Sequence, residues 1–196
     1  AQSYLSRIRK YSTKEGLSHN TIYTMHKDAR GFLWLGTGYG LNRYNGKDFE
    51  WFLKENKGLV SNFVHRVFED DSGLLWLITL ENVFELNWFQ VGEICLLDIY
   101  SGEVFEIEQK FPEGLPFEIA DLHFMKILPD GALMFITLDG NCFKYQSEKG
   151  FYHFKLQFDF YKFLNIIFNI KILESVLGIF CIHFHTQYLI PNTKSS

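Results

Sequence analysis

The stretch GFLWLGTGYGLNRY at residues 31–44 returns in altered form as GLLWLITLENVFEL at residues 73–86. Both stretches begin with glycine, continue through Leu-Trp-Leu and keep a threonine at the same distance. Upstream, the pair Gly-Leu at residues 16–17 is also repeated, at residues 58–59. The interval is 42 residues each time. The chain therefore contains an internal repeat.

An interval of this size is typical of helical solenoids and of four-stranded propeller blades. Each copy has a β-rich run at residues 21–27 or 63–68, an Asp-x-x-Gly turn, the Leu-Trp-Leu strand and a further alternating strand. In the first copy, residues 45–46 are Asn-Gly, which is a strong hairpin signal between two short strands. Because no apolar run has a helical period, the pattern favours propeller blades.

A third, degraded copy follows as LPDGALMFITLDGNCFKY at residues 128–145. Here Asp130-Gly131 is assigned to the turn, Leu-Met-Phe replaces Leu-Trp-Leu, and Thr137 keeps the threonine. This copy follows the second after 58 residues rather than 42. We expect the sixteen extra residues at the outer edge of the second blade or in the loop leaving it, where residues 94–107 predict two strands joined at Ser101-Gly102.

The sequence thus predicts an all-β fold, a partial β-propeller of about three four-stranded blades with a divergent C-terminal tail. A closed propeller needs about four to eight blades, so three are not expected to close alone. Only one glycine and no tryptophan follow residue 150, so the tail is interpreted as off-frame or truncated. The predicted parts are a lead-in strand at 1–15, blade 1 at 16–57, blade 2 with its insertion at 58–115, blade 3 at 116–160 and the tail at 161–196.

Residues that recur at the repeat interval are expected to be structural. The turn glycines supply a positive φ, the turn aspartates bond the backbone, and the tryptophans fill the space between blades. The acidic run at 69–71 is interpreted as a solvated turn, because it lacks the spaced oxygen ligands of a Ca²⁺ site. The structural set comprises Asp28, Gly31, Trp34, Gly36, Thr37, Asp70, Gly73, Trp76, Thr79, Gly131 and Thr137.

Composition argues against several other classes of protein. A hydrophobic fraction of 47% with 18% aromatic residues excludes disorder. A net charge of −4 without a basic cluster argues against a nucleic-acid partner. The apolar run at residues 163–184 contains polar and charged residues, so no membrane span is expected in it.

The sequence carries no motif for a cofactor, a metal or a catalytic nucleophile. No P-loop, GxGxxG in strand-to-helix context, HExxH or nucleophile elbow occurs. Cys95, Cys142 and Cys181 are interpreted as buried thiols. Cys181 alternates with His183 and His185, but no fourth ligand is recognisable, so no zinc site is predicted.

The series Leu-x-x-Asn, Asp-x-x-Gly-x-Leu-Trp-Leu-Gly-Thr and Gly-Leu-x-Arg-Tyr-Asn, over residues 17–45, resembles the two-component regulator propeller repeat. That repeat builds the periplasmic sensor region of Bacteroidetes-type hybrid two-component system proteins, which combine a histidine kinase and a response regulator. The resemblance weakens along the chain, since Ile78 replaces the motif glycine in the second copy and Met134 replaces the tryptophan in the third.

The resemblance implies a periplasmic, non-catalytic module that senses a carbohydrate-type ligand such as an oligosaccharide. Kinase activity and membrane contact would then reside in parts outside this chain. Further propeller blades, or self-association, are the expected protein partners, and no cofactor is implied.

Ligands of propellers usually meet the loops that lead into the innermost strand and those that join the second and third strands. The candidates there are His19, Tyr39 and Asn82. Tyr39 can stack on a sugar ring, while His19 and Asn82 can hydrogen-bond its hydroxyls. Asn20 and Asn62 share one repeat position and are interpreted as satisfying a turn backbone.

Two other functions are compatible with the pattern. The first is an enzyme resembling the propeller lyases that inactivate streptogramins, which requires a histidine and an acidic residue converging on the central axis. The second is a non-catalytic scaffold or remnant, which would stay soluble and bind no ligand.

Overall fold

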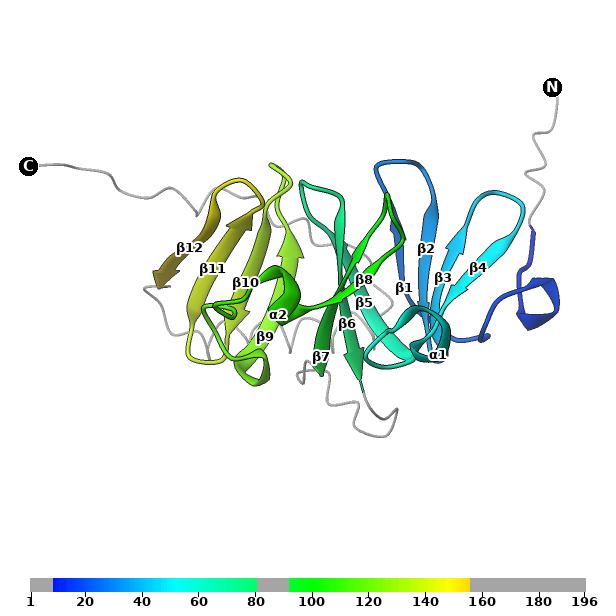
Figure 1. Ribbon diagram of the computed structural model, residues 1–196, viewed down its shortest axis with the longest axis horizontal. Helices are drawn as coiled ribbons and strands as arrows, with labels where there is room; N and C mark the ends of the chain where they lie inside the picture. Colours follow the sequence, from blue (N-terminus) through cyan, green and yellow to red (C-terminus); the bar gives the residue numbers. More distant parts are fainter. Residues whose placement is uncertain (1–8, 81–91, 156–196) are drawn as a thin grey trace, which may run out of the picture. The chain divides into compact units, whose positions relative to one another are not determined.

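The computed structural model describes residues 9–80 and 92–155, and within them twelve strands form three antiparallel sheets (Figure 1). Four short helical segments of the described residues lie outside the sheets: η1 (Thr13–Glu15), α1 (Lys54–Lys57), α2 (Ile107–Lys110) and η3 (Ile119–Asp121). Blade 1 contains β1 (Ile22–Lys27), β2 (Leu33–Thr37), β3 (Gly40–Tyr44) and β4 (Phe49–Phe52). Blade 2 contains β5 (Phe63–Glu69), β6 (Leu74–Leu80), β7 (Glu93–Asp98) and β8 (Val104–Glu106). Blade 3 contains β9 (Leu122–Ile127), β10 (Leu133–Thr137), β11 (Asn141–Gln146) and β12 (Gly150–Lys155).

Each sheet is a simple meander whose strands pair in chain order. The first strands of the blades, β1, β5 and β9, follow one another along the molecule, with β1 and β2 against β5, and β5 against β9. The predicted all-β class with three four-stranded blades is confirmed. The predicted tail at 161–196 lies outside the described residues.

The recurring turn has the same backbone hydrogen bonds in all three blades. In blade 1 the N–H of residue 28 donates to the carbonyl of residue 32 at 3.0 Å, and Gly31 N–H donates to the carbonyl of residue 28 at 2.9 Å. Residues 70–74 repeat this arrangement, and so do residues 128–132. The turn glycine needs a left-handed conformation, with φ of 91° at Gly31 and 84° at Gly73.

This register confirms Gly131 as the turn glycine of the third copy and shows which residue takes the place of the motif aspartate. The residue equivalent to Asp28 and Asp70 is Leu128, not Asp130. In blades 1 and 2 the buried aspartate accepts a hydrogen bond from the indole Nε1 of its own tryptophan, at 2.7 Å and 3.0 Å. Blade 3 has lost both partners together, since Leu128 replaces the aspartate and Met134 replaces the tryptophan.

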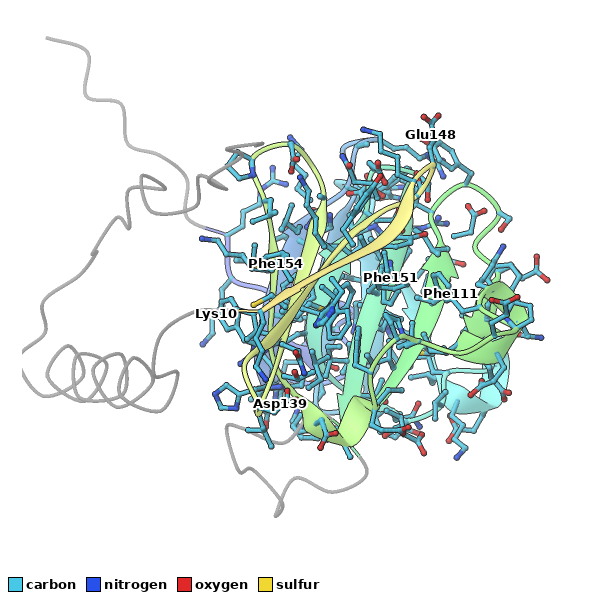
Figure 2. The ribbon with its side chains drawn as sticks, turned by 90° about the vertical axis from the view of Figure 1, so that its left-hand side faces the viewer. Lys10, Phe111, Asp139, Glu148, Phe151 and Phe154 are labelled. Atoms are coloured by element: carbon cyan, nitrogen blue, oxygen red, sulfur yellow. The ribbon has the colours of Figure 1, made fainter. Side chains whose placement is uncertain are left out.

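The tryptophans fill the spaces between blades, as predicted. Trp34 is fully buried in a cluster that joins blades 1 and 2. Trp76 is fully buried in a second cluster that joins blades 2 and 3. Phe111, from the segment after β8, covers the second cluster and lies 5.8 Å from the ring of Phe151 (Figure 2).

Gly36 is required by the close approach of blade 2. A Cβ atom at this position would come within 2.8 Å of the carbonyl oxygen of Val64 in the neighbouring strand β5. In blade 2 the equivalent residue is Ile78, which is buried in the cluster toward blade 3. The motif glycine is therefore a feature of the first contact between blades and not of the fold in general.

The insertion in blade 2 lies mainly between β6 and β7, not at the outer edge or in the loop leaving the blade. Thr37 pairs with Gly40 across a two-residue turn, whereas thirteen residues separate the equivalent pair Thr79 and Glu93. This difference accounts for eleven of the sixteen extra residues. The position of the insertion was predicted wrongly because strand-like alternation continues in the sequence beyond Thr79. The register in which strands pair cannot be read from the sequence.

Two local expectations also need correction. Where a lead-in strand was predicted at 1–15, the described residues 9–15 contain only the 3₁₀ helix η1, which Ser12 caps through its contacts with Glu15. The Asn45-Gly46 turn does join two strands, but across four residues, with Asn45 Oδ1 accepting from the N–H groups of Lys47 and Asp48 at 2.8 Å each.

Candidate functional site

His19 and Tyr39 lie at the same end of blade 1, beside the start of the innermost strand. The Nδ1 atom of His19 accepts from Thr21 N–H at 3.1 Å. The ring packs so closely on the β2–β3 turn that a Cβ atom on Gly38 would lie 3.0 Å from Nδ1. The next residue in that turn, Tyr39, is 44% exposed, and its backbone N–H donates to Thr37 Oγ1 at 3.1 Å. Two of the predicted ligand residues are thus adjacent and reachable.

Hydrogen bonds to the buried side chain of Asn42 hold the loop that carries His19. Ser18 N–H donates to Asn42 Oδ1 at 2.9 Å, and Asn42 Nδ2 donates to Ser18 Oγ at 2.6 Å. Asn42 is fully buried, so these bonds are shielded from water. A fixed loop lowers the ordering cost of binding a ligand.

The other predicted polar residues separate into two groups. Asn20 Oδ1 accepts from Thr13 N–H at 2.9 Å, and Asn62 Oδ1 accepts from Lys54 N–H at 2.7 Å. Both asparagines therefore satisfy backbone groups, as predicted. Asn82 lies outside the described residues and stays a prediction.

The innermost strands contain a shared irregularity that the sequence analysis missed. In β1, β5 and β9 the pairing with the second strand skips one residue at the same register position, which is a β-bulge. The skipped residues are Tyr23, His65 and His123, and each is partly buried. The signal was available, because His65 follows Tyr23 by 42 residues and His123 follows by a further 58.

The bulged residues of blades 1 and 2 lie next to each other. The rings of Tyr23 and His65 are 6.1 Å apart, and Phe63 packs edge-on against Tyr23 at 4.6 Å. Burial lowers the pKa values of His65 and His123, and the charge of Arg66 lowers both further. Both effects favour the neutral form of the two imidazoles at pH 7.

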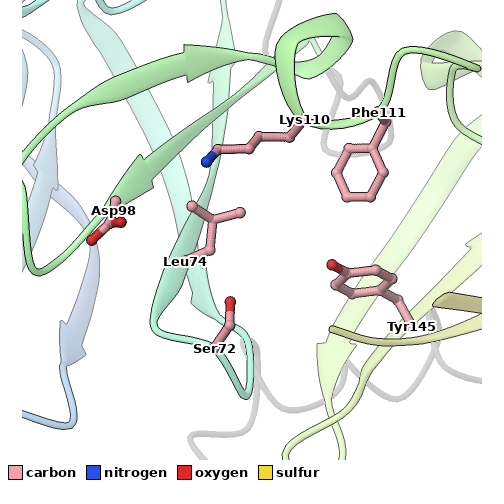
Figure 3. A pocket seen from close by; sticks show the side chains of 6 residues that line it. All are labelled: Ser72, Leu74, Asp98, Lys110, Phe111 and Tyr145. Carbon is pink, nitrogen blue, oxygen red and sulfur yellow. The ribbon is translucent and has the colours of Figure 1, made fainter. Parts of the chain in front are cut away.

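A concave site lies between blades 2 and 3, beside the turn at residues 70–74 (Figure 3). It is a cavity of about 300 Å³ lined by Ser72, Leu74, Asp98, Lys110, Phe111 and Tyr145. Burial, followed by the charges of Asp70 and Asp71, raises the pKa of the Tyr145 hydroxyl to about 12. The phenol therefore stays protonated.

Three polar residues of this cavity, Asp98, Ser72 and Lys110, have partners within the fold. Asp98 Oδ1 accepts from the N–H of Tyr100 at 2.7 Å, and Ser72 Oγ donates to Asp70 at 2.6 Å. The Lys110 ammonium lies 3.9 Å from the centre of the Phe105 ring. These contacts favour a structural role for the cavity over ligand binding.

The acidic run at 69–71 makes contacts between neighbouring blades. The prediction of a solvated turn was therefore wrong. Glu69 Oε2 is 2.6 Å from His26 Nε2 of blade 1, and Glu69 Oε1 accepts from Ala29 N–H at 3.2 Å. Asp70 is buried, and Asp71 accepts from Ser147 N–H of blade 3 at 2.9 Å. Sequence reasoning failed here because exposure depends on the neighbouring blades.

The two described cysteines are buried thiols, as predicted. Burial raises the pKa of Cys95 to about 11 and that of Cys142 to about 11, so neither is a reactive thiolate at neutral pH. Cys181, His183 and His185 lie outside the described residues. Within residues 9–80 and 92–155, no group of three His, Cys, Asp or Glu side chains is placed to hold a metal ion.

The repeat, the register and the stacked sheets define the class of this chain as a partial β-propeller. Residues 16–39 match the family model described as two component regulator propeller. The matched segment contains His19 and ends on Tyr39.

The fold is similar to that of a solved structure of low sequence identity, and a second structure aligns more weakly. One is described as the extracellular domain of a hybrid two component system from B. thetaiotaomicron, with 20% identity and a TM-score of 0.53 over 75% of this chain and 20% of that chain. Virginiamycin B lyase from Staphylococcus aureus has 16% identity and a TM-score of 0.47 over 73% and 44% of the two chains. The present chain spans about a fifth of the length of the first of these structures.

Two further findings concern relatives of the chain and its helices. No curated protein matches the chain. Among the residues that the structure describes, no helix combines the length and apolar character needed to cross a membrane.

Proposed function

We propose that this chain is part of a periplasmic propeller that senses a carbohydrate-type ligand for a hybrid two-component system. The observation that carries the proposal is the matched repeat itself, which ends in an exposed Tyr39 beside a fixed His19. An exposed aromatic ring next to hydrogen-bonding side chains is suited to a sugar, whose faces are apolar and whose edges are polar. Kinase output would belong to parts outside this chain.

Titration calorimetry of the chain against a panel of neutral and acidic oligosaccharides tests this proposal. We expect at least one ligand to bind, and Tyr39→Ala to weaken it about tenfold by removing the stacking surface. Tyr100→Ala is the matched control, because that tyrosine is 66% exposed but lies on the β7–β8 turn of blade 2. Equal affinities for Tyr39→Ala and the unmodified chain would contradict the proposal.

The lyase alternative needs a histidine and an acid on the inner strands. The described pair that meets this requirement is His26 and Glu69, on β1 and β5. Both carboxylate oxygens of Glu69 are already engaged, one by His26 and one by Ala29 N–H. We therefore assign the pair to the joint between blades, and turnover of a streptogramin by the purified chain would reverse that assignment.

The outward face of blade 1 supports a further proposal, that another blade covers it. In blade 2 the paired residues Val67, Leu77 and Cys95 are buried against blade 1. The corresponding row of blade 1 begins with Met25, which is 67% exposed, and ends with Trp51, which is 41% exposed. Leu35 and Asn42, between them in the row, are buried, so the exposed apolar surface lies at its two ends. In the isolated chain we expect a second copy to cover these ends, because exposed apolar surface drives association.

Light scattering of the purified chain measures this directly. Self-association predicts a mass of at least twice 23.1 kDa. Met25→Lys should shift the mass toward the monomer, because it places a charge in the proposed contact. A stable monomer of 23.1 kDa for the unmodified chain would show that this face needs no cover.

A further inference from the structure

The two contacts between blades repeat one pairing of faces. In blade 1, Trp34 and its cross-strand neighbour His26 lie on the face toward blade 2, where His26 Nε2 is 2.6 Å from Glu69 Oε2. In blade 2, Trp76 and its cross-strand neighbour Phe68 lie on the face toward blade 3 and pack in the second cluster. Each contact therefore joins the tryptophan face of one blade to the opposite face of the next blade.

Blade 3 is the last described blade, and its corresponding face is turned away from blade 2. Met134 and Lys126 take the positions of the tryptophan and its cross-strand neighbour. They alternate along their strands with residues such as Phe135, which pack toward blade 2. Met134 is buried, but on the same face Lys126 is exposed, and Phe124 and Tyr152 are 39% and 49% exposed. This outward face of blade 3 thus carries exposed apolar surface.

The outward face of blade 1 is built like the face that blade 2 turns toward blade 1. Lys27 precedes Glu69 by one repeat interval and has the same register position in its strand. Leu17, like its repeat equivalent Leu59, is buried where a short helical segment leads into the blade. Met25 on this face is exposed. The two outward faces are therefore the two kinds of face that pack together inside the chain.

We propose that the outward face of blade 3 binds the outward face of blade 1 in a second copy of this chain, and that two copies close a six-bladed ring. The inference rests on the self-association proposed above and names its second surface. Two copies of three blades give a number within the range of about four to eight that closes a propeller. A contact between two different faces closes a ring or continues as a filament, and closure at two copies covers every outward face.

The repeated register places two lysines opposite each other in this contact. His26 meets Glu69 between blades 1 and 2, so Lys126 of one copy lies opposite Lys27 of the other. Like charges in an interface weaken it. Reversing the charge of one lysine therefore replaces repulsion by attraction, and reversing both restores the repulsion.

Sedimentation equilibrium at pH 7 and low ionic strength measures the dissociation constant of the dimer for each variant. Lys27→Glu should lower this constant about tenfold, and Lys126→Glu should do the same, because the ring contains two such contacts. The variant with both changes should return to about the value of the unmodified chain. Lys54→Glu, in the exposed helix α1, makes the same change of net charge away from both faces and should have no such effect.

The outcomes separate this inference from the self-association on which it rests. A monomer at every concentration overturns both. A dimer that Met25→Lys weakens and Lys126→Glu does not strengthen keeps the association through blade 1 and overturns the contact with blade 3. Complexes larger than two copies overturn the closed ring. Should Lys126→Glu fail to fold by circular dichroism, Phe124→Lys replaces it, and an unchanged dimer in that variant overturns the contact with blade 3.

Discussion

Replacing Trp76 with alanine is expected to lower the free energy of unfolding by about 3–5 kcal/mol. The indole is fully buried at the centre of the cluster between blades 2 and 3. Its ring centre lies 5.3 Å from that of Phe135 and 5.4 Å from those of Phe111 and Tyr145. Truncation removes these contacts and leaves a cavity that backbone strands on both sides cannot collapse to fill.

Urea denaturation followed by circular dichroism measures the change, and Trp51→Ala is the matched control. Trp51 is 41% exposed in β4 and makes one exposed hydrogen bond, from its Nε1 to the carbonyl of Gly16 at 2.7 Å. We expect the control to cost about 1 kcal/mol, the usual worth of one such bond. Similar losses for the two variants would mean that the blades are not held together by the tryptophan.

The second large effect concerns the buried pair of Asp70 and Trp76. Asp70 accepts hydrogen bonds from Ser72 N–H, Leu74 N–H and Trp76 Nε1, at 2.9, 3.0 and 3.0 Å. Asp70→Leu, which copies Leu128 of blade 3, leaves these donors without an acceptor and should cost at least about 2 kcal/mol. Trp76→Met, which copies Met134, should also destabilise the fold.

The double variant should be less destabilised than the sum of the two single variants, by about 1–3 kcal/mol, because each single change leaves the other partner unsatisfied. Blade 3 already shows that the two changes are tolerated together. The control is Asp70→Leu combined with Trp34→Met, since Trp34 is bonded to Asp28 and not to Asp70. Additive losses in the Asp70 and Trp76 cycle would rule out the coupling.

The fold could be predicted because its information is local and repeated. A 42-residue interval, a turn glycine and a buried tryptophan define a blade without knowledge of the neighbouring blades. The third turn was placed correctly at Gly131, but the backbone bonds show that Leu128, and not Asp130, stands at the position of the motif aspartate. The burial of Asp70 and the joint between Glu69 and His26 arise only when blades stack, so local sequence did not reveal them.

The candidate site was predicted in part. His19 and Tyr39 follow from loop position, and the structure places them together at the start of the inner strand. Tyr23, His65 and His123 were missed, although they share a repeat position, because a bulge changes which residues face the sheet partner. The half-buried state of Arg66 depends on packing and has no sequence signal.

The central claim is that ligand binds at the start of the inner strands, and nuclear magnetic resonance titration of the chain with the tightest ligand of the saccharide panel tests it most directly. We predict that the chemical shifts change mainly in residues 18–23, 38–40, 62–66 and 121–123. The chemical shifts around Lys110 and Tyr145 should change little. Changes confined to the cavity lined by Lys110 and Tyr145, or spread evenly over the chain, would contradict the account.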